Sequence, residues 1–176
     1  MESKRLIIRA FQEEDATRLY ELAKDSDVGI HAGWPPHKSI EDSKAIIKSI
    51  LKQDNNFALV EKESGLLIGS CGLQKDPLRN NPLALMLGYW VGKEYWGKGY
   101  TLEAAQEIMN DGFKRLGIQL ISVYCYEYNL RSQRVIEKLG FRKEGLLRQA
   151  VLRFNGDIID ELVYSMTKSE FYHINH

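Results

Sequence analysis

Two glycines flank a lysine just before a helix-like stretch in the sequence EYWGKGYTLEAA, residues 94–105. Glycine adopts left-handed backbone conformations readily and lets a ligand approach the main chain, so Gly97 and Gly99 favour a tight turn. A helix that starts near Thr101 would add its positive N-terminal end, a combination typical of phosphate-binding turns. The turn alone identifies no ligand, because a strand-to-helix connection that binds nothing explains it equally well.

Three phosphate ligands can be compared with this turn. A P-loop needs Ser or Thr after the lysine to hold magnesium, and Gly99 stands there instead. A dinucleotide turn needs a third glycine where this chain has Leu102. The pyrophosphate of coenzyme A needs neither residue, and the backbone N–H groups from Gly97 through Thr101 suit it. Coenzyme A is therefore the phosphate ligand that fits best.

A second segment with chemical character is NLRSQRVIEKLGF, residues 129–141. It predicts a short helix that is closed by Gly140. Asn129 and Ser132 are one helical turn apart, so their side chains share a face. An amide and a hydroxyl at this spacing can cap the helix or bind polar ligand atoms, and for Asn129 the two roles are compatible.

The elements that must position these segments follow from hydrophobic periodicity. The expected strands are residues 5–11, 56–62, 66–74, 83–92 and 119–128, followed by a hairpin that turns near Asn155 and Gly156. The expected helices are residues 13–25, 39–53, a helix from the glycine turn to Gly117, and 129–141. Residues 28–37, VGIHAGWPPH, break the periodicity and predict a shaped loop. This order predicts an α+β fold with a mostly antiparallel sheet.

Composition limits the class of protein. The 176 residues fit one domain, residues 1–176, and the 44% hydrophobic and 27% charged residues are typical of globular proteins. Equal totals of 24 basic and 24 acidic residues give a net charge of +0, so we expect neither nucleic acid nor a membrane surface as a partner. A homo-oligomer is compatible with the sequence.

The two cysteines, Cys71 and Cys125, are far apart in apolar stretches. We expect buried, reduced side chains rather than a disulfide or a metal site, since no His/Cys cluster has metal-ligand spacing. No signal peptide and no membrane-spanning run is recognisable. These features predict a cytoplasmic protein without a metal.

The stretch YWVGKEYWGKGYTLEA and residues 129–141 together resemble the GNAT superfamily of acyl-CoA-dependent N-acetyltransferases. More narrowly, W-G-x-G-Y-x-x-E-A followed by N-x-x-S-x-x-x-x-E-K-x-G-F is similar to the Rim-type branch, which acetylates the N-terminal amine of ribosomal proteins. The expected element order matches over nearly the whole chain. The resemblance implies a mixed, mostly antiparallel central sheet of about seven strands, flanked by about four helices, whose splayed central strands hold the coenzyme.

The resemblance also implies where acetyl-CoA binds as co-substrate. Backbone groups near Trp90 and Val91 would pair with the pantetheine arm, and a nearby N–H would polarise the thioester carbonyl. The glycine turn would hold the pyrophosphate, and Arg134 would reach the 3′-phosphate, although Lys98 and Arg134 fit a solvated surface equally well. The implied coenzyme-binding residues are Trp90, Val91, Gly97, Lys98, Gly99, Tyr100, Thr101, Asn129, Ser132 and Arg134.

Catalysis is implied for Ser132 and Asn129. Asn129 would contact the pantetheine arm near its sulfur end, and Ser132 would hydrogen-bond the sulfur and could protonate the leaving thiolate. Many relatives use a tyrosine seven residues after the asparagine, where this chain has Ile136. A plain first-turn position is the alternative for Ser132. For Glu103 we expect a structural hydrogen bond rather than catalysis.

The general base and the acceptor are less determined by the sequence. Strand 83–92 carries no carboxylate, so the base could be a residue elsewhere or an ordered water. The acceptor is expected near the loop 28–37 and the strand 119–128, with His31, Trp34, His37 and Tyr126 as substrate-binding residues. The candidate bases are His31, His37, Glu94, Asp157, Asp160 and Glu161.

The leading interpretation is therefore an enzyme that moves acetyl from acetyl-CoA to a primary amine through a tetrahedral intermediate. The amine could be a protein N-terminus or a small molecule. Because no strand carboxylate is present, a non-catalytic acyl-CoA-binding regulatory domain stays open as an alternative. A nucleotide-binding module is a third interpretation, and competition between coenzyme A and ATP or NAD would test it.

Overall fold

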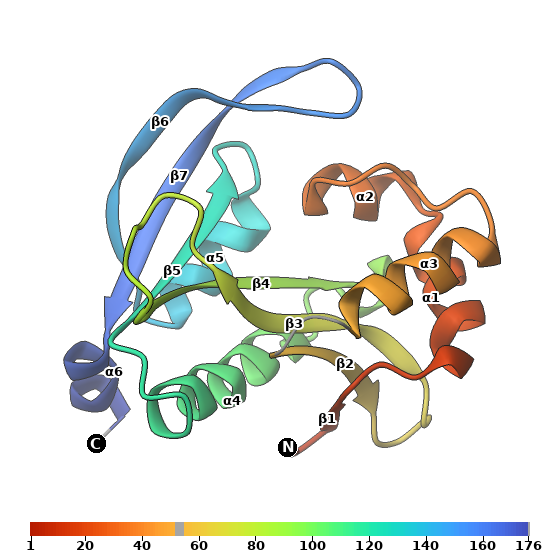
Figure 1. The fold of residues 1–176 in the computed structure, drawn as a ribbon, viewed down its shortest axis with the longest axis horizontal. Helices are drawn as coiled ribbons and strands as arrows, with labels where there is room; N and C mark the ends of the chain where they lie inside the picture. Colours follow the sequence, from red (N-terminus) through yellow and green to blue (C-terminus); the bar gives the residue numbers. More distant parts are fainter. Residues whose placement is uncertain (52–54, 176) are drawn as a thin grey trace. The chain divides into compact units, whose positions relative to one another are not determined.

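A computed structural model of the chain describes residues 1–51 and 55–175 (Figure 1). Seven strands form one sheet in the order β1-β2-β3-β4-β5-β7-β6. The sheet is mostly antiparallel, and the β4–β5 pair is parallel. The α+β fold with about seven strands is confirmed. The strands are β1 (Leu6–Arg9), β2 (Asn56–Glu61), β3 (Leu67–Lys75), β4 (Ala84–Val91), β5 (Leu120–Tyr126), β6 (Arg142–Leu152) and β7 (Ile158–Thr167).

The helices within the described ranges number six rather than the expected four or so. Short 3-10 turns, η1 (Glu13–Asp15) and η2 (Lys93–Tyr95), precede α1 and α4. The last residues of the helix predicted over 39–53 lie outside the described residues. The helices are α1 (Ala16–Ala23), α2 (Ser26–Ala32), α3 (Ile40–Ile50), α4 (Tyr100–Lys114), α5 (Leu130–Lys138) and α6 (Lys168–Asn175).

The chain divides into two compact units. Unit 1 comprises Met1–Gly72 and Tyr89–Glu107, and unit 2 comprises Leu73–Gly88 and Ile108–His176. Three elements, β3, β4 and α4, therefore contribute residues to both units. In unit 1, β2 pairs antiparallel with β1 and β3, and α1 packs against α2 and α3.

Helix α2 corrects the prediction of an irregular loop over residues 28–37. The Asp25 side chain accepts a hydrogen bond from the Asp27 N–H and caps the helix, which ends at Gly33 with φ 88°. The sequence did not predict this helix because Gly29 lies within it and glycine has a low helix propensity. A Cβ at Gly29 would lie 2.6 Å from the Trp34 carbonyl oxygen, so the glycine permits this close approach of the chain.

In unit 2, the central strands β4 and β5 separate as the resemblance implied. Their parallel pairing runs from Ala84 with Leu120 to Met86 with Ser122, and in the described chain it continues no further along Leu87 and Gly88. On its other side β5 pairs with β7 over its full length. Strands β6 and β7 form a long hairpin, visible as the blue ribbon of Figure 1, whose turn includes Gly156 at φ 90°.

Helix α6 was not expected from the sequence. Thr167 and Glu170 form a reciprocal cap at its start: the Glu170 N–H donates to Thr167 Oγ1 and the Thr167 N–H donates to Glu170 Oε2. The Thr-x-x-Glu pattern of a capping box is present in the sequence and could have predicted the start of this helix. The helix buries Phe171 beside Phe113 of α4, with ring centroids 5.0 Å apart.

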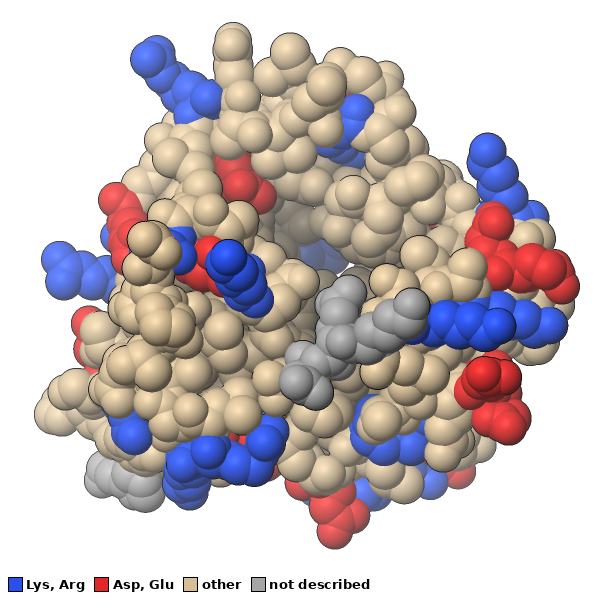
Figure 2. All heavy atoms as spheres, viewed as in Figure 1, with Lys and Arg blue, Asp and Glu red and all other residues tan. Residues whose placement is uncertain are grey.

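The distribution of surface charge and the state of the two cysteines can be compared with the sequence analysis. Basic and acidic side chains are interspersed on the face shown in Figure 2. Cys71 and Cys125 are buried and free, as expected. Across residues 1–51 and 55–175, no helix is long and apolar enough to cross a membrane. The same ranges contain no cluster of three or more His, Cys, Asp or Glu side chains that could hold a metal ion.

Candidate functional site

The glycine turn lies in unit 1 and leads directly into α4. Gly97 and Gly99 have φ values of 74° and 81°, in the left-handed region that favours glycine. Both glycines and Lys98 are exposed, and apart from Gly97 and its two chain neighbours no atom of residues 1–51 or 55–175 lies within 4 Å of a Cβ placed on Gly97. The first backbone hydrogen bond of the helix joins the Glu103 N–H to the Gly99 carbonyl, so the helix leaves the preceding N–H groups unpaired. This geometry fits a pyrophosphate.

Glu103 has the structural role that the sequence predicted. Its Oε1 accepts from Ser3 Oγ at 2.7 Å and from the Arg5 backbone N–H at 2.6 Å. Its Oε2 accepts from Arg5 Nε at 2.7 Å. Burial alone would raise the pKa of Glu103, but these hydrogen bonds outweigh it and lower the pKa. The Glu103 side chain therefore connects the first turn of α4, through hydrogen bonds, to the segment that precedes β1.

Trp90 and Val91 end β4 in unit 1. The Val91 carbonyl accepts a hydrogen bond from Trp96 Nε1 at 3.0 Å. A carbonyl oxygen has two lone pairs and can accept a second hydrogen bond. The indole of Trp96 therefore uses an acceptor on the backbone segment that the resemblance assigned to the pantetheine arm.

The three residues predicted for the acceptor side of unit 1 make aromatic contacts in two groups: Trp34 contacts His37 and Trp90, and His31 contacts Trp96. The Trp34 ring centroid is 5.4 Å from that of His37 and 5.5 Å from that of Trp90. The His31 ring lies edge-on to Trp96 at 5.9 Å. His31 Nδ1 donates to the Asp27 carbonyl, and His37 Nδ1 hydrogen-bonds Ser43 Oγ at 2.8 Å. Burial lowers the pKa of His37 and so favours its neutral form.

In unit 2, Asn129 and Ser132 lie together as predicted. Asn129 caps α5, and its Oδ1 accepts from the Ser132 N–H at 3.2 Å. The amide nitrogen of Asn129 is therefore the part of the side chain suited to a ligand. Ser132 also hydrogen-bonds Cys125: burial raises the pKa of the Cys125 thiol to about 11, and the contact with Ser132 lowers it by less. Arg134 is exposed on α5.

Tyr126 ends β5 and stacks on Tyr128, with ring centroids 5.7 Å apart and planes inclined by 27°. The guanidinium of Arg153 lies 5.7 Å from the Tyr126 ring centroid and 5.6 Å from that of Tyr128. Burial raises the pKa of Tyr126. Tyr126 therefore belongs to a group of two tyrosines and one arginine in unit 2, in which Arg153 is buried and Tyr128 is exposed.

The candidate bases differ in their partners. Glu94 forms an ion pair with Arg18 at 2.8 Å. Asp157 pairs with Arg153 at 3.6 Å, and Asp160 accepts from the Gln149 N–H at 2.7 Å. Glu161 is the exception, because its carboxylate has no hydrogen-bond or ion-pair partner among residues 1–51 and 55–175.

Glu161 lies opposite Tyr126 in the β5–β7 register and opposite Leu147 in the β6–β7 register. Paired residues share a face of a sheet, so Glu161 and Tyr126 lie on the same face. Cys125 points to the other face, because side chains alternate along a strand. Burial raises the pKa of Glu161 above its ordinary value. A half-buried carboxylate with a raised pKa is suited to accept a proton.

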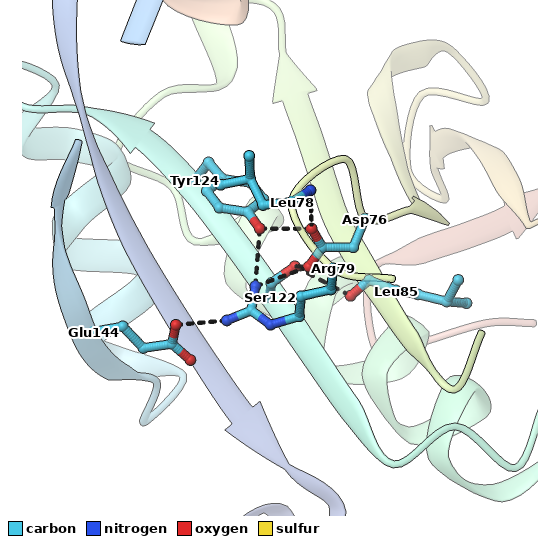
Figure 3. A network of polar contacts seen from close by, with 7 residues as sticks. All are labelled: Asp76, Leu78, Arg79, Leu85, Ser122, Tyr124 and Glu144. Atoms are coloured by element: carbon cyan, nitrogen blue, oxygen red, sulfur yellow. Dashed lines mark hydrogen bonds and ion pairs between the residues drawn. The ribbon is translucent and has the colours of Figure 1, made fainter. Parts of the chain in front are cut away.

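A buried carboxylate that the sequence analysis missed lies in the same unit (Figure 3). Asp76 is 1% exposed and accepts from Ser122 Oγ, the Tyr124 hydroxyl, the Leu78 N–H and Arg79. Burial alone would raise its pKa, but these four donors lower it. Burial and Asp76 raise the pKa of Tyr124 to about 12. The network orders β5 two residues before Tyr126.

The structure thus brings predicted residues together in three local groups: the turn 97–101, the aromatic group of Trp34, His37 and Trp90, and the start of α5 with Asn129 and Ser132. His31 packs against Trp96 instead. Tyr126 lies beside Glu161. The sequence analysis did not identify Arg5 and Asp76, since only contacts with residues distant in the sequence reveal their roles.

Comparisons with known proteins define the class. The model of the acetyltransferase (GNAT) domain matches residues 5–142. The chain is 30% identical over 174 residues to p20 of Bacillus licheniformis, an uncharacterised N-acetyltransferase, with 96% of each protein covered. It is 27% identical over 176 residues to YdaF of Bacillus subtilis, whose name describes a ribosomal N-acetyltransferase, with 96% and 94% covered.

Solved structures agree on the fold. A GNAT-family acetyltransferase from Bacillus anthracis matches with a TM-score of 0.86 and 27% identity, covering 97% of this chain and 99% of that one. A spermidine N-acetyltransferase from Vibrio cholerae in complex with CoA and spermine has the same fold, with a TM-score of 0.80 and 18% identity over 96% and 98% of the chains. The chain belongs to the GNAT acetyltransferase family. It is an N-acetyltransferase, and the family uses acetyl-CoA.

Proposed function

We propose that the enzyme transfers acetyl from acetyl-CoA to the α-amine of a polypeptide N-terminus, with Glu161 as general base. The observation that carries this proposal is the half-buried Glu161 carboxylate, which lacks a partner among the described residues and lies beside Tyr126. The similarity to YdaF supports the same acceptor class. A single domain over residues 1–176 and a cytoplasmic location, suggested by the buried free cysteines, belong to the same proposal.

The coenzyme contacts are proposed on local geometry. The turn from Gly97 to Thr101 binds the pyrophosphate, as its left-handed glycines and unpaired helix N–H groups suggest. Backbone groups of Trp90 and Val91 pair with pantetheine amides. Asn129 donates to the arm through its amide nitrogen, since its oxygen accepts from the Ser132 N–H, and Arg134 is exposed for the 3′-phosphate.

The proposed reaction is a direct transfer. Glu161 accepts a proton from the ammonium form of the acceptor, and the neutral amine attacks the thioester carbonyl carbon to form a C–N bond. The tetrahedral intermediate releases the second amine proton to solvent and collapses to the amide with cleavage of the C–S bond. Ser132 donates a proton to the departing thiolate, and solvent restores the hydroxyl proton.

The choice of an α-amine rests on proton affinity. A chain α-amine has a pKa of about 8, whereas a lysine amine has a pKa of about 10.4. A carboxylate whose pKa is raised by burial can therefore deprotonate an α-amine at neutral pH with less difficulty than an alkyl amine.

The surroundings of Tyr126 also favour this acceptor over a polyamine. The Arg153 guanidinium lies near both Tyr126 and Tyr128, and positive charge repels a polycation. The neighbouring hairpin exposes apolar side chains that suit a peptide better than a polyamine: Leu147, Leu152, Phe154 and Ile158. His31, Trp34 and His37 are proposed to line the acceptor side of unit 1.

The test is thiol release from acetyl-CoA with three acceptors: a short peptide with a free α-amine, the same peptide with a blocked α-amine, and spermidine. We expect turnover with the free peptide and background rates with the other two. Faster turnover with spermidine would contradict the acceptor. Binding of coenzyme A without turnover on any amine would favour a regulatory domain.

A further inference from the structure

We propose that Arg5 is a positioning residue for the coenzyme: it orients the peptide between Lys98 and Gly99 so that the Gly99 N–H faces the pyrophosphate. This inference rests on the proposed function, since it assumes that the turn binds coenzyme A. Arg5 lies just before β1, more than 90 positions from the turn in sequence, and no motif pointed to it.

One guanidinium contacts the turn and the helix that follows it. Arg5 Nη1 donates to the Lys98 carbonyl at 2.9 Å. Arg5 Nε donates to Glu103 Oε2 at 2.7 Å, and its central carbon lies 4.3 Å above the ring centroid of Tyr100. A Cβ on Gly99 would lie 3.5 Å from Arg5 Nη2, so the guanidinium lies directly against that glycine.

The geometry of a trans peptide links this contact to the ligand side of the turn. No cis peptide bond occurs in the described chain. In a trans peptide the carbonyl and the N–H point in opposite directions. When the Lys98 carbonyl points at Arg5, the Gly99 N–H must therefore point away from it. The opposite orientation would present a carbonyl oxygen to an anion, which is repulsive.

The turn needs such an anchor because glycines on both sides of Lys98 permit either peptide orientation. Gly97 and Gly99 both have positive φ, and glycine loses more conformational freedom on ordering than any other residue. Fixing the peptide before the ligand arrives removes that cost from binding. Arg5 therefore contributes preorganisation in addition to positive charge.

Arg5 is itself held in place. Its backbone N–H and Ser3 Oγ both donate to Glu103 Oε1. Tyr100, whose ring lies under the guanidinium, donates a hydrogen bond from its hydroxyl to Glu61. The planar fork of arginine can serve a carboxylate and a carbonyl at once, whereas the lysine ammonium is a point charge on a flexible stem.

The test compares ligands with and without a pyrophosphate by titration calorimetry. For Arg5→Met we expect the Kd of coenzyme A to rise about tenfold, because the Gly99 N–H loses its fixed direction, and the Kd of pantetheine to stay unchanged. Arg5→Lys keeps the charge without the fork, so it should restore only part of the affinity. Arg9→Met is the matched control, since Arg9 lies four residues further along the chain, at the end of β1, and pairs with Asp15.

Each outcome decides one question. If the wild type does not bind coenzyme A, the proposed function fails and not only this inference. If the wild type binds and Arg5→Met binds equally well, Arg5 does not position the turn. Equal weakening of coenzyme A and pantetheine, or full affinity with Arg5→Lys, also contradicts the inference. Should Arg5→Met fail to fold, Arg5→Lys alone decides it.

Discussion

At the residue scale, Ser132 carries the proposal for the leaving group. Its backbone N–H is used by the Asn129 cap and its hydroxyl contacts Cys125, so the side chain is held at the start of α5. A thiol with a pKa of about 8.5 leaves readily even without an acid. The contribution of Ser132 should therefore be near the lower end of the range for general acids.

For Ser132→Ala we expect kcat to fall on the order of 100-fold, the lower end of general acid–base contributions. Ser132→Thr keeps a hydroxyl and should restore most of the rate. Steady-state kinetics at saturating acetyl-CoA measure both variants. An unchanged kcat in Ser132→Ala would leave Ser132 with a contact role only.

Glu161 gives a second prediction, because replacing it should reduce the activity of the enzyme without reducing its stability. Since burial raises its folded pKa, the folded state holds its proton more tightly than the unfolded state. Its contribution to stability is therefore lost as pH rises through the folded pKa. Above that pH the folded state must bury an ionised carboxylate, which costs free energy. Glu161→Gln removes this cost, so we expect no loss of thermal stability at pH 7.

The same variant should lose activity. We expect kcat/KM to fall about 100-fold or more and the acidic limb of its pH profile to disappear. Asp160 is the neighbouring residue and lies on the opposite face of β7. Asp160→Asn keeps an oxygen that accepts from the Gln149 N–H, so this variant should retain both kcat/KM and the acidic limb. A Glu161→Gln enzyme with an unchanged acidic limb would exclude Glu161 as the base.

At the element scale, sequence reasoning succeeded where the signal was local. The Asn129 cap and the left-handed glycines of the turn follow from side-chain and backbone preferences within a few residues. Helix α2 was missed because Gly29 contradicts helix propensity and is explained only by its contact with Trp34. Choosing Glu161 among six candidate bases required the strand register and the partners of the others, which no local pattern contains.

The Asp76 network predicts how the β3–β4 connection is held in unit 2. For Asp76→Ala we expect a loss of about 3–5 kcal/mol, because buried donors from Ser122, Tyr124 and Arg79 lose their acceptor. Glu144→Gln, which affects the exposed end of the same network, should cost less than about 1 kcal/mol. Urea unfolding measures both, and equal losses would contradict a buried anchor at Asp76.

At the scale of the whole molecule, carboxylates with lowered pKa values occur in both units. Hydrogen bonds outweigh burial to lower the pKa of Asp15 and Glu103 in unit 1 and of Asp76 in unit 2. Hydrogen bonds also lower the pKa of Glu170, which caps α6. Each contributes stability that is present above the unfolded pKa of about 4 and is lost as pH falls through the folded pKa.

We therefore expect the free energy of unfolding to fall as pH drops from about 5 toward and below the lowered pKa values. Urea unfolding across this range measures the trend. Asp76→Asn should reduce its slope, because one lowered carboxyl is removed. A free energy that stays constant down to the lowest of these pKa values would contradict the assignment of these carboxylates as ionised anchors.

The central claim is acetylation of a polypeptide α-amine, and the position of the product's acetyl group tests it most directly. One peptide with both a free N-terminus and an internal lysine is incubated with isotopically labelled acetyl-CoA, and tandem mass spectrometry locates the label. The account predicts the label on the N-terminal nitrogen, at a rate that Glu161→Gln reduces. Label on the lysine side chain, or an α-amine rate that Glu161→Gln leaves unchanged, would contradict it.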